Sequence, residues 1–335
     1  MNLRTQMSFP LLSGLLIMAL AAVSVLALNT GLADIAVLTG LRDFFNGEPT
    51  LAANVVGQIR LPRLILALVI GATLGMSGAA MQGLLRNPLA DPGVLGVSSG
   101  AAFGAICTLY FGVAATAWYW LPAAAIVGAL FTLFMVYVLA GLHGSMLALI
   151  LAGTAMSSIM VALIAVTLNF APSLYAMQEI VFWLLGSLAN RHFDHVSIAL
   201  PLALIGWVMM LSRSRFLDAL SLGEDSARSL GFNNNRERGI LLLGISIAVG
   251  ACVAVSGAIG FIGLVIPHLL RPFVGYRPGR LMLASALGGA LLLVLADILV
   301  RQFDSARELK IGVVTSLIGA PFFLFLILKT RSRWA

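Results

Sequence analysis

The sequence predicts an all-α polytopic membrane protein, with about ten transmembrane helices in a single domain over residues 1–335. Hydrophobic residues make up 60% of the chain and charged residues 10%, and the mean hydropathy is +1.03. An ordinary soluble domain carries about 25% charged residues. One span needs roughly 20 apolar residues, so a chain of 335 residues has room for about ten. The 34 glycines favour helices that pack closely in lipid through small residues.

Ten apolar segments mark the expected spans, and the eighth of them is the shortest. They cover residues 9–29, 64–84, 93–113, 120–141, 147–169, 195–212, 239–258, 259–270, 281–303 and 311–329. The first is longer than the apolar core of a signal peptide, which has about 7 to 15 residues, so we expect it to be retained as a span. An even number of crossings places both termini on the same side of the membrane.

The positions of Lys and Arg predict the orientation, because these residues are held on the cytoplasmic side of a membrane. With both termini inside, 13 of the 20 basic residues are cytoplasmic: Arg4, Arg86, Arg213, Arg215, Arg228, Arg236, Arg238, Arg271, Arg277, Arg280, Lys329, Arg331 and Arg333. The other seven lie outside: Arg42, Arg60, Arg63, Arg191, Arg301, Arg307 and Lys310. We therefore predict cytoplasmic termini and a long cytoplasmic loop over residues 213–238, where a cytoplasmic partner could bind.

Several functions are disfavoured by composition. The net charge of +7 would also suit a nucleic-acid-binding protein, but the basic residues of a membrane protein collect in its cytoplasmic loops, so we expect no nucleic-acid partner. Cys107 and Cys252 lie inside apolar runs, without the spacing of a metal site or a disulfide framework. The sequence contains no P-loop, nucleophile constellation or metal-ligand cluster, so it predicts no catalytic residue, cofactor or metal.

A short pattern recurs within the chain. Gly71, Ala72, Ser77, Gly78 and Ala79 return with identical spacing in a second apolar segment, as Gly250, Ala251, Ser256, Gly257 and Ala258. In the expected topology the two helices run in opposite directions, as in the inverted repeats of many transporters. Chance recurrence among Gly and Ala is the alternative.

A few charged residues lie at or within the expected spans. Arg60 and Arg63 flank Pro62 at the outer end of the second span, and predict two positive charges facing the outer solution. Arginines at helix ends also reach the interface without any binding role. Asp297 lies inside an apolar span, and it is either part of a proton relay or a structural charge paired with Arg301 at i, i+4.

The long cytoplasmic loop contains a short helical pattern at residues 222–231, LGEDSARSLG. Gly231 can end this helix in the left-handed conformation. Glu224 and Asp225 near its start and Arg228 one turn later suit the helix dipole. A merely solvated loop is the alternative.

Five longer motifs resemble a known family. They are RLPR at 60–63, SGAAMQGLLRNPLADPGVLGVSSGA at 77–101, LGEDSARSLG at 222–231, SGAIGFIGLVIPHLLR at 256–271 and ELKIGVVTSLIGAPFF at 308–323. In this order and spacing they resemble the permease subunits of type II ABC importers for ferric siderophores, heme and cobalamin. The resemblance implies a homodimer of ten-span subunits in the lipid of the bacterial inner membrane, joined to two cytoplasmic ATP-binding subunits and a periplasmic substrate-binding protein.

The resemblance also implies roles for particular residues. Arg60 and Arg63, with Arg301 as a third contact, would meet glutamates of the binding protein and orient its docking. Residues 222–231 would form the coupling helix that sits in a cleft of the ATPase, through Gly223, Glu224, Asp225, Ala227, Arg228, Leu230 and Gly231.

Two gates are implied as well. Ser145, Met146 and Leu147 align with the short loop that closes the pore toward the cytoplasm, where the cobalamin permease carries small hydroxyl residues and this chain has a bulkier, apolar pair. Residues 173–190 resemble the periplasmic gate helix region, whose aromatic residues here are Tyr175, Phe182 and Trp183. An interfacial aromatic belt is the alternative for these three side chains.

The implied function is import of a metal chelate from periplasm to cytoplasm, driven by ATP hydrolysis in a separate subunit and with no chemistry in the chain itself. We expect an iron chelate, either heme or a ferric siderophore, because the cytoplasmic gate is less polar than in the cobalamin permease; cobalamin is the alternative. A proton-coupled secondary transporter is a remote alternative, since Asp297 is the only carboxylate suited to a relay.

Overall fold

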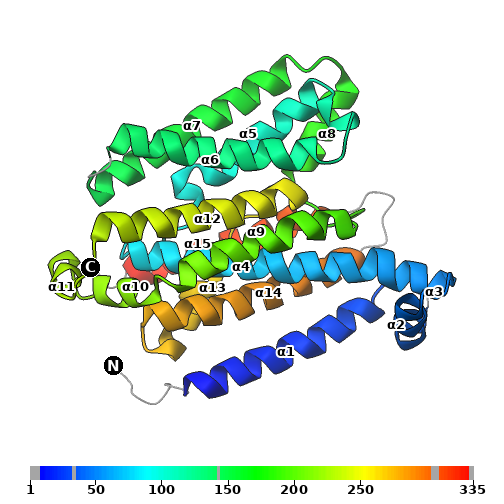
Figure 1. The fold of residues 1–335 in the computed structure, drawn as a ribbon, viewed down its shortest axis with the longest axis horizontal. Helices are drawn as coiled ribbons and strands as arrows, with labels where there is room; N and C mark the ends of the chain where they lie inside the picture. The colour runs from blue at the N-terminus through cyan, green and yellow to red at the C-terminus, as the bar shows by residue number, and fades with distance from the viewer. Residues whose placement is uncertain (1–7, 32–34, 142–143, 303–308, 332–335) are drawn as a thin grey trace.

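The computed structural model describes residues 8–31, 35–141, 144–302 and 309–331, and every regular element within them is a helix (Figure 1). In chain order these are α1 (Phe9–Asn29), α2 (Val37–Asn46), α3 (Leu51–Ala53), α4 (Leu61–Leu84), α5 (Val97–Tyr110), α6 (Trp120–Ala140), α7 (Met146–Asn169), α8 (Leu174–Leu184), α9 (Phe193–Leu211), α10 (Ser214–Leu220), α11 (Glu224–Ser229), α12 (Asn234–Ser256), α13 (Ile262–Leu270), α14 (Pro278–Gln302) and α15 (Ile311–Arg331). A π-helical turn over Asn54–Arg60 joins α3 to α4, so that one continuous helix runs from Leu51 to Leu84.

The all-helical membrane fold predicted from composition is confirmed. Seven helices of the described chain are long and apolar enough to cross a membrane: α1, the α3–α4 helix, α6, α7, α9, α12 and α14. The remaining three predicted segments contain α5, α13 and α15. Every one of the ten apolar segments therefore holds a helix, although not all of these helices have the length of a full span.

Two of the predicted segments hold helices that are too short for a full span, and a local backbone feature explains each. The segment 93–113 contains a 3₁₀ turn over Pro92–Leu95, and α5 starts only after Gly96, whose φ of 72° breaks the helix. The segment 259–270 contains only the nine residues of α13, because Phe261 at its N-cap also has a positive φ, of 68°. Both helices are therefore shorter than a bilayer is thick.

The centre of the bundle is the helix that contains α4. In its most apolar stretch 89% of the residues are buried, compared with 11% in α1, which lies along one side of the bundle (Figure 1). α4 packs along α14 and also contacts α9, α12 and α13, while α5, α6, α7 and α8 form a separate group on the other side of α12. Because the centre of the bundle is filled by buried helices, functional residues are expected where the bundle ends or opens.

Small residues allow the backbones of α4 and α14 to lie in direct contact. A Cβ atom added at Gly75 of α4 would lie 1.9 Å from the carbonyl oxygen of Ser285 in α14, and one added at Gly71 would lie 2.4 Å from the oxygen of Gly289. No side chain fits into such a gap. The close packing predicted from the glycine content is therefore present between α4 and α14.

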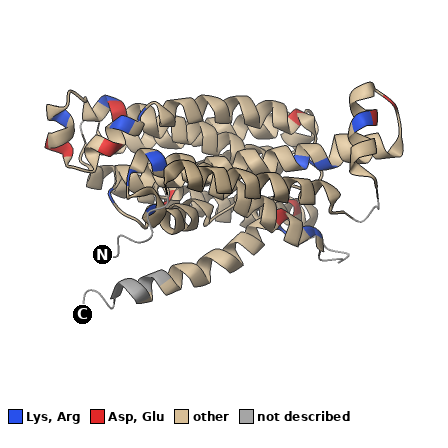
Figure 2. Ribbon diagram, turned by 90° about the horizontal axis from the view of Figure 1, so that it is seen from below, with Lys and Arg blue, Asp and Glu red and all other residues tan. Residues whose placement is uncertain are grey.

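The charged residues gather at the two ends of the bundle (Figure 2). One end carries α11, together with the start of α1 and the end of α15, and is called the α11 end below (Figure 1). The opposite end carries α2 and is called the α2 end. The basic residues Arg4, Arg307 and Arg333, which entered the orientation prediction, lie outside the described residues.

The helices of the recurring glycine pattern run in opposite directions, as the topology predicted. α4 runs from the α2 end to the α11 end, and α12 runs back (Figure 1). Gly78 and Gly257, which match in the pattern, have different structural roles, however. Gly78 faces the backbone of Gly263, whereas Gly257 ends α12 with a φ of 72°. The inverted repeat itself stays a prediction.

Replacing Gly75 by Ala is expected to destabilise the bundle, because the added methyl group forces α4 and α14 apart. Overpacking of this kind typically costs about 1–3 kcal/mol. The measurement is the thermal unfolding midpoint of the purified protein in detergent. Gly14→Ala in α1 is the matched control, since nothing lies within 4 Å of a Cβ added there; equal midpoints for the two variants would contradict the packing described above.

Candidate functional site

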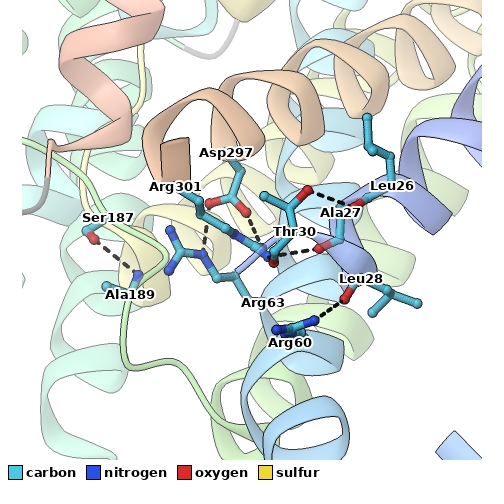
Figure 3. A network of polar contacts seen from close by, with 10 residues as sticks. All are labelled: Leu26, Ala27, Leu28, Thr30, Arg60, Arg63, Ser187, Ala189, Asp297 and Arg301. Atoms are coloured by element: carbon cyan, nitrogen blue, oxygen red, sulfur yellow. Dashed lines mark hydrogen bonds and ion pairs between the residues drawn. The ribbon is translucent and has the colours of Figure 1, made fainter. Parts of the chain in front are cut away.

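Three arginines and one aspartate form a polar network at the α2 end (Figure 3). The Oδ1 atom of Asp297 accepts a hydrogen bond from Arg63 Nε at 2.9 Å, and Oδ2 pairs with an Nη atom of Arg301. The side chain of Asp297 is only 2% exposed. The carboxylate of α14 thus bridges one guanidinium of α4 and one of its own helix.

The same network holds the end of α1. Arg60 donates to the carbonyl oxygen of Leu28 at 2.7 Å, and Arg301 donates to those of Ala27 at 3.0 Å and Thr30 at 3.4 Å (Figure 3). These carbonyls belong to the last turn of α1, whose C-terminal oxygens have no partner within the helix and attract cations through the helix dipole. A Cβ at Gly31 would lie 2.7 Å from the Arg60 guanidinium, so a larger residue there would require the Arg60 side chain to shift.

The sequence predicted part of this network. Of the two alternatives for Asp297, the pairing with Arg301 at i, i+4 is the one that the structure contains. Arg60 and Arg63 lie at the predicted end, but Arg60 is only 5% exposed and Arg63 turns toward Asp297, so neither simply faces the outer solution. The reason is that Asp297 and the carbonyls of α1 offer them nearer partners. The docking role of Arg60, Arg63 and Arg301 stays a prediction.

At the α11 end, residues 213–238 contain the short helices α10 and α11 and the start of α12, and α11 is fixed to α12. Arg238 of α12 pairs with Glu224 at 2.6 Å, and Asn234 donates to the Glu224 carbonyl at 3.2 Å. Ala227 of α11 is fully buried. Gly223 and Gly231 have φ values of 122° and 88°, so the predicted left-handed end of the helix at Gly231 is confirmed.

The outer surface of α11 remains open to a partner. Leu230 is 63% exposed and Leu222 73%, and Asp225 and Arg228 form a solvent-facing pair at 3.5 Å. This segment therefore combines an anchored inner side with an outer side that carries apolar and charged groups. Its coupling role stays a prediction.

The two predicted gates lie near opposite ends of α7. At the α11 end, the Ser145 hydroxyl caps α7 by accepting from the Ala148 amide at 3.2 Å, and Leu147 is 65% exposed. At the α2 end, the chain turns after α7 into α8, where Tyr175 is 77% exposed. The predicted gate helix therefore exists, while the gating role of Ser145, Met146, Leu147, Tyr175, Phe182 and Trp183 stays a prediction.

A cavity of about 510 Å³ opens beside α8. Its lining includes Phe182 and Trp183 of α8, Glu179, Arg191 and Lys310. The Lys310 ammonium lies 5.9 Å from the centre of the Phe182 ring. Burial lowers the pKa of the Arg191 guanidinium from its ordinary value, because the charged form loses water there. Sequence patterns could not reveal this cavity, since its walls come from segments far apart in the chain.

α12 links the two ends of the bundle. It begins beside α11, and at its other end the Ser256 carbonyl accepts from the Ser187 amide at 2.8 Å, just after α8. A Cβ at Gly257 would lie 2.1 Å from the Trp183 carbonyl oxygen, so this contact also requires a glycine. One helix therefore touches both the anchored loop and the predicted outer gate.

Comparison with known families agrees with this architecture. The model of the FecCD transport family matches residues 17–329 of the chain. The chain belongs to the FecCD transport family. The resemblance inferred from the five sequence motifs is thereby confirmed.

Relatives of this FecCD protein are permeases of ABC importers. It is 41% identical over 280 residues to the hemin transport system permease protein HmuU of Yersinia pestis, covering 82% of this chain and 84% of that protein. It is 39% identical over 289 residues to the vitamin B12 import system permease protein BtuC of Vibrio cholerae, covering 86% of each. The chain is therefore a membrane transport subunit of the type II ABC importer class.

A solved structure supports the same assignment. It is an inward-facing conformation of an ABC transporter assigned to the metal-chelate type, with a TM-score of 0.84 and 34% sequence identity. The match covers 96% of this FecCD chain and 100% of the other. The arrangement of helices described above is therefore that of an ABC permease.

Replacing Asp297 by Asn in this FecCD permease is expected to cost about 3–5 kcal/mol of folding free energy, because it removes the charge that Arg63 and Arg301 share in a buried site. The measurement is the free energy of unfolding in detergent, with Asp225→Asn as the control because the Asp225 side chain is 97% exposed. A variant at position 297 as stable as the control would show that the network does not hold the fold.

Proposed function

We propose that this permease carries an iron chelate, heme or a ferric siderophore, from the periplasm to the cytoplasm as part of an ABC importer driven by a separate ATPase. Cobalamin is the alternative substrate. The observation that supports the proposal is the placement of two polar sites at opposite ends of an apolar bundle: the arginine network at the α2 end and the α11 segment at the other. Such a protein has one face for each of two soluble partners.

The proposed orientation puts the α2 end in the periplasm and the α11 end, with both termini, in the cytoplasm of an inner-membrane protein. The arginine network then meets acidic residues of a substrate-binding protein, and α11 sits against one of two ATP-binding subunits. The exposed apolar surface near Leu222 and Leu230 supports a protein contact at α11, because such residues are otherwise unfavourable in water.

A second copy of the chain completes the proposed path. Both predicted gates are carried by α7 and the helix that follows it, and both present exposed side chains, Leu147 and Tyr175. Two such helices facing one another form a conduit with a gate at each end. In this proposal α12 transmits the movement of α11 to the outer gate. α12 contacts Glu224 of α11 at its start and Ser187, just after α8, at its end.

Relatives alone do not choose the substrate, because the identities to the hemin permease and the vitamin B12 permease differ by only two percentage points, 41% against 39%. Two features of this chain favour an iron chelate. The predicted inner gate carries the apolar pair Met146 and Leu147, and the described lining of the outer cavity has the cations Arg191 and Lys310 against one carboxylate, Glu179. Anionic chelates such as heme carry carboxylates that suit this cavity, whereas the side chains of cobalamin are mainly neutral amides.

The proposal predicts ATP-dependent uptake by vesicles that contain the permease, its ATPase and its binding protein. Heme, a ferric siderophore and cobalamin are supplied separately as labelled substrates, and accumulation inside the vesicle is measured with ATP and with vanadate. Uptake of an iron chelate that stops with vanadate supports the proposal. Preferential uptake of cobalamin selects the alternative, and uphill uptake by the permease with no ATPase present refutes the mechanism.

Replacing Leu230 by Ser is expected to weaken association with the ATPase about tenfold, since burying one leucine contributes about 1.5–3 kcal/mol. Folding should be unaffected because the side chain is exposed. The measurement is the dissociation constant of permease and ATPase in nanodiscs. Leu51→Ser is the control, because Leu51 is 75% exposed at the opposite end of the bundle; equal effects of the two substitutions would remove α11 as the docking segment.

A further inference from the structure

Two residues that line the cavity beside α8 each carry a buried hydrogen-bond donor that has no acceptor among the described residues. The donors are Nε of Arg191 and Nε1 of the Trp183 indole. A buried N–H without an acceptor is unfavourable, and most buried N–H groups in proteins donate to another protein group or to an ordered water. Two of them beside one cavity point to an acceptor that enters from outside.

The charge in the cavity defines the kind of acceptor. Among the described lining residues Arg191 and Lys310 outnumber Glu179, so this part of the lining is formally cationic. Burial lowers the pKa of Arg191, which means that its charged form lacks the stabilisation that water or an anion would supply. A guanidinium matches a carboxylate with two parallel hydrogen bonds, which gives both strength and orientation.

The aromatic lining defines the rest of the ligand. Phe182 and Trp183 both border the cavity, and they belong to the helix that the sequence predicts as the periplasmic gate. A volume of about 510 Å³ has room for a carboxylate-bearing arm beside these rings. The rings suit the apolar body from which such an arm extends.

We propose that this cavity is an anion subsite, in which Arg191 and the Trp183 indole N–H hold a carboxylate of the arriving chelate beside the outer gate. The proposal rests on the proposed function for the identity of the ligand, and it assigns to the cavity a recognition step before translocation. A chelate whose carboxylates are blocked lacks the group that these donors bind.

The test measures binding to the full-length permease in lipid nanodiscs by equilibrium dialysis, with empty nanodiscs subtracted. The probes are hemin, hemin dimethyl ester, which keeps the ring but lacks free carboxylates, and iron(III) citrate. Arg191→Gln is expected to weaken hemin and iron(III) citrate about tenfold, the loss of one charge-assisted hydrogen-bonded pair, and to leave the ester unchanged. Arg42→Gln is the matched control, because Arg42 is exposed on α2 at the same end and does not line the cavity.

A second pair of variants separates the indole donor from the aromatic ring. Trp183→Phe keeps a ring and removes the N–H, and is expected to weaken the carboxylate probes about threefold. Trp120→Phe is its control, since Trp120 is exposed and does not line the cavity. If Arg191→Gln fails to fold, Arg191→Lys, which keeps the charge and loses the planar fork, takes its place with a smaller expected loss.

The proposal is overturned if the Arg191 variant binds hemin and iron(III) citrate as tightly as the unaltered protein, or if the ester is weakened as much as hemin. It is also overturned if the unaltered permease binds neither carboxylate probe. The vesicle experiment is independent of these results, because it measures ATP-dependent uptake of an iron chelate and not binding to the cavity.

Discussion

Hydrocarbon offers no hydrogen bonds, and this one constraint organises the molecule. A backbone in lipid must satisfy its own polar groups, which is why the described spans are helices. With no hydrophobic drive between helices in lipid, close contact depends on small residues, and Gly71 and Gly75 of α4 touch the backbone of α14 directly. Charges are then displaced to the ends of the bundle, where both polar sites of the protein are found (Figure 2).

Sites confined to opposite ends can influence one another only through rigid helices between them. α12 meets this requirement, because the Glu224–Arg238 pair ties its start to α11 and the Ser187–Ser256 hydrogen bond ties its end to the segment after α8. Because residue 257 is a glycine, the end of α12 can also lie directly against the Trp183 carbonyl oxygen. A shift of α12 along or about its axis would therefore move both α11 and the segment after α8. No chain of side-chain contacts between the two ends would be needed.

The sequence predicted what depends on local pattern and missed what depends on chain folding. Apolar runs located the helices, and i, i+4 spacing offered the observed Asp297–Arg301 pair as one of two alternatives. The breaks at Gly96 and Phe261 lie inside apolar runs and had no hydropathy signal. Arg63 and Asp297 are 234 positions apart and Arg60 and Leu28 are 32 apart, so no spacing rule could join them. The motifs named the family, but the cavity beside α8 became visible only in three dimensions.

The arginine network also bears on the docking of a binding protein that we propose at the α2 end. Among the described residues, the guanidinium groups of Arg63 and Arg301 share the carboxylate of Asp297, with Arg60 beside them. The proposed attraction of an acidic partner to this cluster is electrostatic, so salt should screen it. The same guanidinium groups hold the last turn of α1. In the proposed docking, a partner carboxylate that draws Arg60 outward would compete with the Leu28 carbonyl, so docking and the position of α1 would depend on one another.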